Sequence, residues 1–250
     1  MTSLLEISRV SRDFGGVRAL DDVSFSVAEG EMVGLIGPNG AGKTTLMNVI
    51  CGLTRATEGA VVFAGSSLNN VRPNAINHLG IARTFQIPKP FVGMTVWENV
   101  LTASLFGGRR GRSADARRAA VERALEIVGL SPRARVAAES LNVAGRKRLE
   151  LARALAMEPR LLLLDEVMAG LNLKEVEAVM GVVERVNGEG VTVLLIEHVM
   201  KAVMGLARRI VVLHHGQVLA EGTPEDVTRD PDVIAAYLGS GIAYEGQDAR

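Results

Sequence analysis

The sequence predicts an α/β fold built on a parallel β-sheet with helices on both faces. Two short apolar runs, Leu161–Leu164 and Val191–Ile196, enclose a segment, Lys174–Asn187, that has the pattern of a helix. Wholly apolar strands that alternate with helices are typical of a parallel sheet buried on both sides. The length of 250 residues allows one large domain or two small ones with a sizeable core.

The other elements follow in chain order from runs of apolar residues and from their spacing. The further strands are expected at Leu4–Val10, Val23–Val27, Met32–Ile36, Ala60–Ala64 and Ile210–Leu213. A helix is expected at Lys43–Cys51, and helical patterns dominate from about Thr95 to Met157. Within that region Ala114–Val128 repeats apolar residues at helical spacing, with charged residues on the other face.

Turn-forming and capping residues punctuate these elements. Thr223 and Pro224 predict a helix start, since threonine caps a helix and proline fits its first position. Gly107–Gly111 is expected to be a loop, and residues 239–250 are expected to form a polar C-terminal tail.

Composition excludes several classes of protein. The 28 basic residues balance 28 acidic ones, which argues against a protein that coats nucleic acid. The longest stretch without a charged residue, Gly59–Val71, is too short and too polar to cross a bilayer. The single cysteine, Cys51, excludes an intrachain disulfide and is expected in the core. We therefore expect a soluble, cytosolic chain.

A glycine-rich segment between a predicted strand and a predicted helix indicates phosphate binding. It matches the pattern Gly-x4-Gly-Lys-Ser/Thr and comprises Gly37, Pro38, Asn39, Gly40, Ala41, Gly42, Lys43 and Thr44. Glycines let backbone N–H groups face phosphates, and the helix N-terminus adds its positive end. Lys43 would reach the β- and γ-phosphates, and the Thr44 hydroxyl would bind Mg²⁺. The alternative is a glycine turn that merely precedes a lysine.

Polar side chains also follow two of the apolar strands. Asp165 and Glu166 come after Leu161–Leu164, and His198 follows the next strand. Ligands of open α/β sheets bind at the carboxyl ends of the strands. Asp165 would hold Mg²⁺ through water, and Glu166 would orient or deprotonate an attacking water. The alternatives are acids that only cap a core strand and a histidine that is structural. His214 and His215 precede Gly216 and are expected in a solvated turn.

Taken together, these motifs resemble the ATP-binding subunit of an ABC transporter from about Leu4 to Leu238. The resemblance implies a P-loop NTPase (RecA-like) core with an N-terminal antiparallel β subdomain and an α-helical subdomain inserted at about residues 92–157, in a single domain of residues 4–238. It implies that Phe14 stacks on adenine, rather than being a core aromatic, and that Thr45 closes the phosphate loop. It also implies that Gln86 links Mg²⁺ and water to the helical subdomain and that His198 is the switch histidine. The implied catalytic residues are Glu166, His198 and Gln86, and the implied metal ligands are Thr44, Gln86 and Asp165.

The sequence departs from the family pattern at two places. The signature loop, Leu-Ser-Gly-Gly-Gln in the family, is here Leu141–Gly145, so Asn142, Ala144 and Gly145 would contact the nucleotide of a partner subunit. The basic residues 146–148 that follow are expected on a solvated face; the alternative is that one faces the partner's phosphate. Asn172 stands where most members have aspartate.

Four further segments resemble the subunits that drive branched-chain amino acid import, namely Ala82–Gln86, Met94–Val100, Ala169–Asn172 and Ile234–Gly239. Importers of urea or amides share some of these motifs. The resemblance implies ATP and Mg²⁺ as cofactors, a homodimer or a heterodimer with a paralogous ATPase, transmembrane permease subunits and, indirectly, an extracytoplasmic substrate-binding protein. It implies a peripheral position on the cytoplasmic face of the plasma membrane and no nucleic-acid partner. Two alternatives are a regulatory or nucleic-acid-associated ATP switch and a small-molecule kinase.

Overall fold

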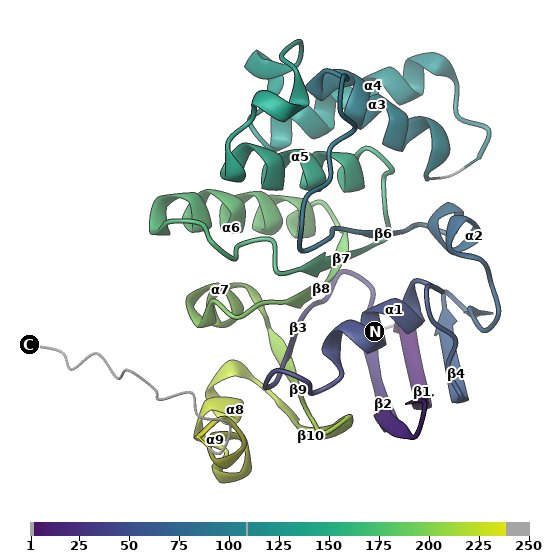
Figure 1. Ribbon diagram of the computed structural model, residues 1–250, viewed down its shortest axis with the longest axis vertical. Helices are drawn as coiled ribbons and strands as arrows, with labels where there is room; N and C mark the ends of the chain where they lie inside the picture. Colours follow the sequence, from purple (N-terminus) through teal and green to yellow (C-terminus); the bar gives the residue numbers. More distant parts are fainter. Residues whose placement is uncertain (1–2, 109, 239–250) are drawn as a thin grey trace, which may run out of the picture.

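The computed structural model describes residues 3–108 and 110–238, which form two β-sheets with helices around them (Figure 1). The antiparallel sheet has the order β2 (Val17–Ala28), β1 (Ser3–Phe14), β4 (Glu58–Phe63) and β5 (Ser66–Ser67). The second sheet has the order β10 (Gln217–Gly222), β9 (Arg209–His214), β3 (Met32–Ile36), β8 (Thr192–Ile196), β7 (Leu161–Asp165) and β6 (Ile81–Arg83). All its neighbours pair in parallel except β10, which runs antiparallel to β9. The predicted α/β fold is confirmed.

The helices include the predicted ones and some that the sequence did not reveal. The helices are α1 (Lys43–Ile50), α2 (Pro73–His78), α3 (Val96–Phe106), α4 (Ala114–Ile127), α5 (Val143–Leu155), α6 (Leu173–Gly188), α7 (Met200–Leu206), α8 (Pro224–Arg229) and α9 (Pro231–Leu238), with single 3-10 turns at Ser131–Arg133 and Ala138–Ser140. Helices α2, α7 and α9 and strands β5, β6 and β10 were not predicted. Each has eight residues or fewer, which is too short for a clear apolar period.

The central strands are uniformly apolar because both of their faces are buried. Residues Leu161–Leu164 have no exposed surface. Successive strand side chains point to opposite faces, so Leu162 and Leu164 join one hydrophobic cluster and Leu161 and Leu163 join the other. The first cluster includes apolar residues of α5, α6 and α7, and the second includes those of α1 and the antiparallel sheet.

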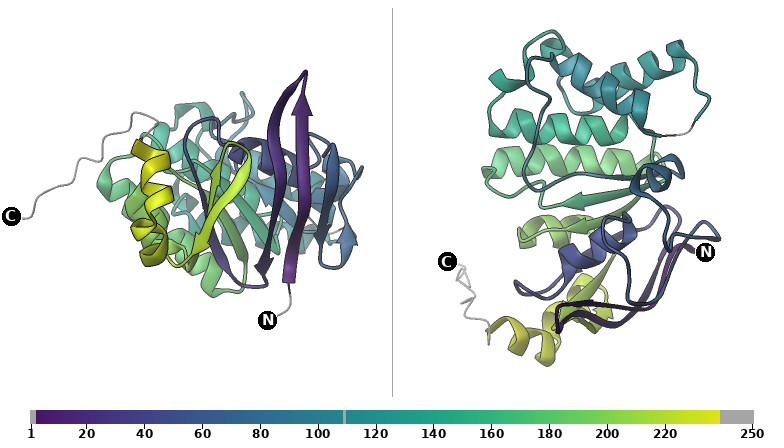
Figure 2. Two further views of the ribbon diagram at one scale, coloured as in Figure 1. Left: turned by 90° about the horizontal axis from the view of Figure 1, so that it is seen from below. Right: turned by 45° about the vertical axis from the view of Figure 1, so that its right-hand side comes forward.

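Helices α3, α4 and α5 gather at one end of the molecule, above α6 in Figure 1 and in the right-hand view of Figure 2. They contact one another, and Thr95 pairs with Ala137 across the segment that carries α3 and α4. Thr95 also caps α3 through a reciprocal pair of hydrogen bonds with Glu98. These helices lie within the region predicted as an inserted helical subdomain; its boundaries at residues 92 and 157 stay a prediction.

Helix α8 begins as the sequence predicts, with Thr223 as its cap and Asp226 returning the hydrogen bond to the cap residue. Part of the predicted loop Gly107–Gly111 (residue 109) and the predicted tail 239–250 lie outside the described residues. Over residues 3–108 and 110–238, no helix has both the length and the apolar character needed to span a membrane.

Candidate functional site

Parallel pairing brings the predicted site residues to one edge of the second sheet. Strands β3, β7 and β8 pair side by side, with Asp165 opposite Ile196. The chain continues from the carboxyl end of β3 into the glycine-rich segment. It continues from β7 into Glu166, and from β8, through Glu197, into His198. Residues more than 100 positions apart in the sequence therefore face a common region.

The glycine-rich segment, called the phosphate loop below (Gly37–Thr44), turns sharply at positions that exclude larger residues. Gly37 has φ 148°, and a Cβ atom there would lie 2.0 Å from the carbonyl oxygen of Leu213. Gly42, which precedes α1, has φ 102°, and a Cβ atom would lie 2.6 Å from the carbonyl oxygen of Ala19. Only glycine fits both the left-handed backbone and the close approach. The loop is thus packed against strands β2 and β9, and it leads directly into the N-terminus of α1.

Lys43 is buried at the start of α1. Its Nζ donates hydrogen bonds to the carbonyl oxygens of Gly37, at 2.6 Å, and Pro38, at 3.0 Å. Burial lowers the pKa of Lys43, while the nearby carboxylates of Glu166 and Asp165 oppose that change. The ammonium group and the N-terminus of α1 together favour an anion at this loop.

Asp165 forms a buried ion pair that the sequence did not reveal. Its Oδ2 lies 2.6 Å from Nη2 of Arg83, and both side chains are about 6 % exposed. Arg83 also donates to Oδ1 of Asn48 on α1, at 2.7 Å, and the Thr84 hydroxyl accepts the backbone N–H of Asp165. Arg83 lies in the segment Ala82–Gln86 that carried the family resemblance, but only the strand pairing of β6 with β7 places it beside Asp165.

The three predicted catalytic residues meet directly. Nε2 of Gln86 donates to Oε2 of Glu166. Nε2 of His198 lies 2.9 Å from Oε1 of the same carboxylate. The His198 side chain is 45 % exposed, so it is not a core histidine; whether its role is catalytic or structural stays a prediction. The catalytic roles of the three residues stay predictions, but their side chains form one cluster beyond the ends of β7 and β8.

The residues predicted as metal ligands suit Mg²⁺ in type. Thr44, Gln86 and Asp165 offer hydroxyl, amide and carboxylate oxygens, which are the donors that Mg²⁺ prefers. Over residues 3–108 and 110–238, no group of three or more His, Cys, Asp or Glu side chains could hold a metal ion. Proteins commonly hold Mg²⁺ through one or two carboxylates together with substrate phosphates and water, and Asp165 supplies one carboxylate here.

The divergent signature loop forms the start of α5. Asn142 is exposed and caps the helix, because its Oδ1 accepts the N–H of Gly145 at 2.9 Å. Ala144 and Gly145 are buried, whereas Val143 is 60 % exposed. Any contact with a partner through this loop must therefore use Asn142, Val143 or the backbone. Asn172 caps α6 in the same way, through reciprocal hydrogen bonds with Glu175.

The prediction that residues 146–148 form a solvated basic face is wrong for Lys147. Arg146 is exposed and donates to the carbonyl oxygens of Leu141 and Glu139. Lys147 is 6 % exposed and points inward. Lys147 lies three residues after the buried Ala144 and four before the buried Leu151, which is the spacing of one helix face. This spacing indicated burial, but the charge of the side chain pointed to the surface.

The remaining residues singled out in the sequence differ in exposure. Phe14 ends β1, is 45 % exposed and lies under the Arg12 guanidinium at 4.3 Å, so the alternative of a core aromatic is wrong. The rings of His214 and His215 lie 4.0 Å apart between centroids, tilted by 50°, and the two residues line a cavity of about 720 Å³ with Pro38, Asn39, Gly40 and Ala41. Cys51 is buried as predicted, and burial raises the pKa of its thiol to about 11.

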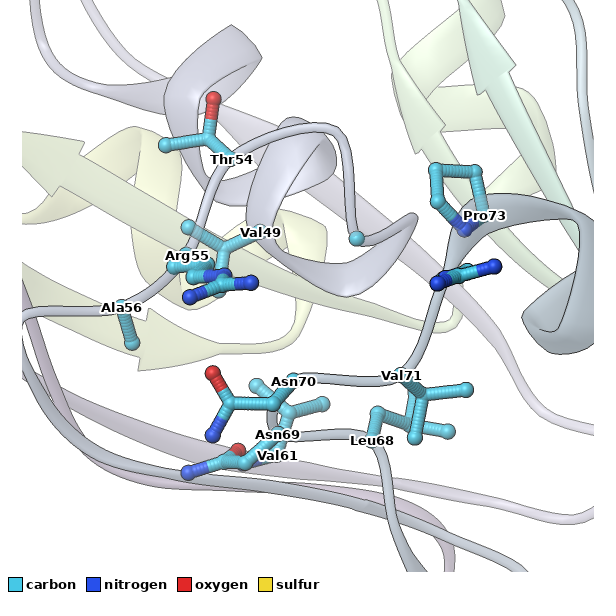
Figure 3. Close-up of a pocket in the computed structure, with 12 residues that line it drawn as sticks. Val49, Thr54, Arg55, Ala56, Val61, Leu68, Asn69, Asn70, Val71 and Pro73 are labelled. Carbon is cyan, nitrogen blue, oxygen red and sulfur yellow. The ribbon is translucent and has the colours of Figure 1, made fainter.

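A separate pocket of about 170 Å³ lies at the far end of α1, where Val49, Arg55 and Asn70 contribute to its lining (Figure 3). None of the predicted site residues lines it. The candidate site is therefore the sheet edge rather than this pocket.

Comparison with known proteins identifies the family. A family model described as "ABC transporter" matches residues 20–169. The chain belongs to the ABC transporter family. A second family model, described as "Branched-chain amino acid ATP-binding cassette transporter", matches residues 217–243 of this cassette. The predicted family and its ATP binding are thereby confirmed.

Similar proteins extend over almost the whole cassette. The high-affinity branched-chain amino acid transport ATP-binding protein LivG of Salmonella typhimurium is 41 % identical, with 94 % of this chain and 98 % of LivG covered. BraF of Pseudomonas aeruginosa, which has the same description, is 40 % identical with the same coverage. A solved structure described as the ADP conformation of MJ1267, an ATP-binding cassette of an ABC transporter, is 33 % identical with a TM-score of 0.87, covering 96 % of this chain and 100 % of that chain.

We expect Arg83→Met to destabilise the cassette, because the change leaves the buried Asp165 carboxylate without its counter-charge. Breaking a buried pair in this way costs about 3–5 kcal/mol. Urea denaturation would measure the free energy of unfolding. Arg160→Met, which removes a surface pair with Glu29, is the control and should cost less than about 1 kcal/mol. Equal effects of the two changes would contradict the importance assigned to the Arg83–Asp165 pair.

Proposed function

We propose that this cassette hydrolyses ATP to power an importer of branched-chain amino acids. The observation that supports hydrolysis most directly is the cluster of Gln86, Glu166 and His198 at the edge that carries the phosphate loop. The substrate class is supported by the family match at residues 217–243 and by the descriptions of LivG and BraF. Import of urea, an amide or another small molecule is the alternative for the substrate.

The chain's own residues divide the work of hydrolysis. The backbone N–H groups of the phosphate loop and Lys43 bind the β- and γ-phosphates, and Phe14 stacks on the adenine. Bound Mg²⁺, held by Thr44, Gln86 and Asp165, would supply charge neutralisation at the phosphates. Glu166 orients the attacking water and accepts its proton as the water oxygen bonds to the γ-phosphorus, while the bond from that phosphorus to the β,γ-bridging oxygen breaks and ADP leaves with the electron pair. Gln86 and His198 fix the Glu166 carboxylate from two sides.

Two copies, or this cassette and a paralogous ATPase, would close head to tail over ATP. A related cassette, MJ0796, has been solved as a dimer in a post-hydrolysis state with ADP and Pi; it is 27 % identical, with a TM-score of 0.79 over 88 % of this chain and 99 % of that chain. In such a dimer the signature loop of one subunit faces the phosphate loop of the other. ATP then stabilises the closed state, and hydrolysis releases it.

A permease subunit would dock beside the Gln86 loop. Five large apolar side chains are exposed between β6 and α3, and these are Phe85, Ile87, Phe91, Val92 and Met94. Exposed apolar surface of this kind marks protein interfaces, and the five side chains all lie in the one segment 85–94. Docking there places the cassette on the cytoplasmic face of the plasma membrane. An extracytoplasmic binding protein would deliver the substrate to that permease.

Lys43→Ala should weaken ATP binding and abolish hydrolysis, because the change removes the buried cation that faces the phosphates. Calorimetric titration with ATP and release of phosphate would measure both effects. Lys201→Met, which changes an exposed lysine paired with Glu177, is the control and should behave as wild type. Unchanged affinity and turnover in Lys43→Ala would refute the phosphate-loop assignment.

Glu166→Gln should bind ATP normally and turn it over about 10²–10⁴-fold more slowly, as expected for the loss of a positioned base. Glutamine keeps the shape of the side chain but does not accept the proton of water. Light scattering with Mg-ATP should then detect a trapped dimer if subunit contacts suffice without the permease. Near-normal hydrolysis would place the catalytic base elsewhere.

Asn142→Arg should retain near-normal ATP affinity in the isolated subunit and lose most ATPase activity when the permease is present. The long cation would fill the space where the signature loop must approach the partner's phosphate. Because Asn142 also caps α5, the matched control is Asn142→Ala, which removes the cap at a cost of about 1 kcal/mol without adding bulk. Dimer lifetime must be measured as well, since arginine pairing with phosphate would slow release instead. Normal ATPase activity in a folded Asn142→Arg subunit would refute a role for this loop in the partner's site.

A small-molecule kinase or a regulatory ATP switch would give different results. Co-purification with membranes that contain the permease favours the transport function over both alternatives. Phosphate transfer to a small-molecule acceptor would indicate the kinase.

A further inference from the structure

Lys147 joins the two segments that carry the predicted catalytic side chains. It lies near the start of α5, and its Nζ donates to the backbone carbonyl oxygen of Gln86 at 2.8 Å and to that of Glu166 at 2.8 Å. The two acceptors belong to the loop after β6 and to the turn after β7. One ammonium group therefore links α5, the helix that begins at the signature loop, to both of these segments.

The backbone of Glu166, which Lys147 contacts, has an unusual conformation. Its φ of 49° lies in the left-handed region, which is costly for a residue with a side chain. Its N–H donates to the carbonyl oxygen of Ile196 at 2.9 Å. Its carbonyl oxygen accepts from Nζ of Lys147 at 2.8 Å and, at the longer distance of 3.4 Å, from the N–H of Ala169. Both backbone polar groups of Glu166 are therefore bonded, and Lys147 makes the shorter contact with the carbonyl oxygen.

The surroundings of Lys147 are built for a buried cation. Burial lowers the pKa of Lys147, and the carboxylates of Glu197, Glu166, Asp165 and Glu150 oppose that change. Glu197 is 2 % exposed and accepts the N–H of Met168 at 2.8 Å, which connects the residue before His198 to the segment after Glu166. Four carboxylates thus offset part of the cost of burying the ammonium group that donates to the two carbonyl oxygens.

We propose that Lys147 is a positioning residue for hydrolysis, which holds the backbones of Gln86 and Glu166 in register and links them to the helix that carries the signature loop. This inference rests on the proposed ATPase function. Since α5 begins at the loop that would meet the partner's ATP, a displacement of α5 is passed through Lys147 to the catalytic carboxylate of the same subunit. The two nucleotide sites of a dimer would then be coupled through this side chain.

The test compares Lys147→Met, Lys147→Arg and Lys201→Met in the intact chain. Small displacements of catalytic groups can reduce rates by about 10²-fold. We expect kcat for ATP to fall about 10–100-fold in Lys147→Met, with the dissociation constant for ATP within about twofold of wild type, because the phosphate loop is untouched. Lys147→Arg, which keeps donors for both carbonyl oxygens, should recover most of kcat, and Lys201→Met should match wild type.

A double-variant cycle separates positioning from a general loss of stability. If Lys147 acts through Glu166, then adding Lys147→Met to Glu166→Gln should slow hydrolysis little beyond the single Glu166→Gln change. If Lys147→Met does not fold, Lys147→Gln, which keeps one donor, takes its place under the same criteria. A fall in kcat below threefold, no recovery in Lys147→Arg, or fully additive losses in the cycle would overturn the inference. Wild-type protein that binds ATP but never hydrolyses it, alone or with its permease, would instead overturn the proposed function.

Discussion

The parallel alignment of β3, β8 and β7 is the constraint on which the rest of the cassette depends. Because the strands run in one direction and are buried on both faces, their carboxyl ends meet at a single edge. The polar residues that follow the strands therefore lie at that same edge. Hydrophobic burial along the whole sheet therefore brings the phosphate loop, Glu166 and His198 together, and the chemistry of the edge is a consequence of the packing of the core.

The same edge concentrates buried cations, and each of them donates hydrogen bonds to oxygen atoms of another part of the chain. Lys43 donates to the phosphate loop, Arg83 pairs with Asp165, and Lys147 donates to the backbone of Gln86 and Glu166. A buried charge is tolerated only where hydrogen bonds and counter-charges replace water. The contacts of these side chains thus join α1, α5 and three strands at the point where the nucleotide would bind.

How far the sequence predicts this arrangement depends on whether a signal is local. The phosphate loop, the strand Leu161–Leu164 and the start of α8 at Thr223 depend on neighbouring residues, so their patterns are readable. The partners of Arg83 and Lys147 lie between 19 and 82 positions away, and only the fold brings them together. A charged residue next to other charged residues looks solvated in the sequence, which is why Lys147 was assigned to the surface. Short elements such as β6 were missed because three residues contain no period.

The divergent signature loop can be understood from the structure of the helix that it begins. Asn142 supplies the cap that the start of α5 needs, and the methyl group of Ala144 is accommodated in the interior. The residues that differ from the family pattern therefore preserve the start of α5, and they change mainly the side chains that are exposed to a partner. In a head-to-tail dimer, a partner's nucleotide would meet a carboxamide at Asn142 and the apolar side chain of Val143, with Lys147 directed away from it toward Glu166 in its own subunit. The charge of Lys147 thus faces the catalytic edge of its own chain, whereas Arg146 is exposed beside the loop.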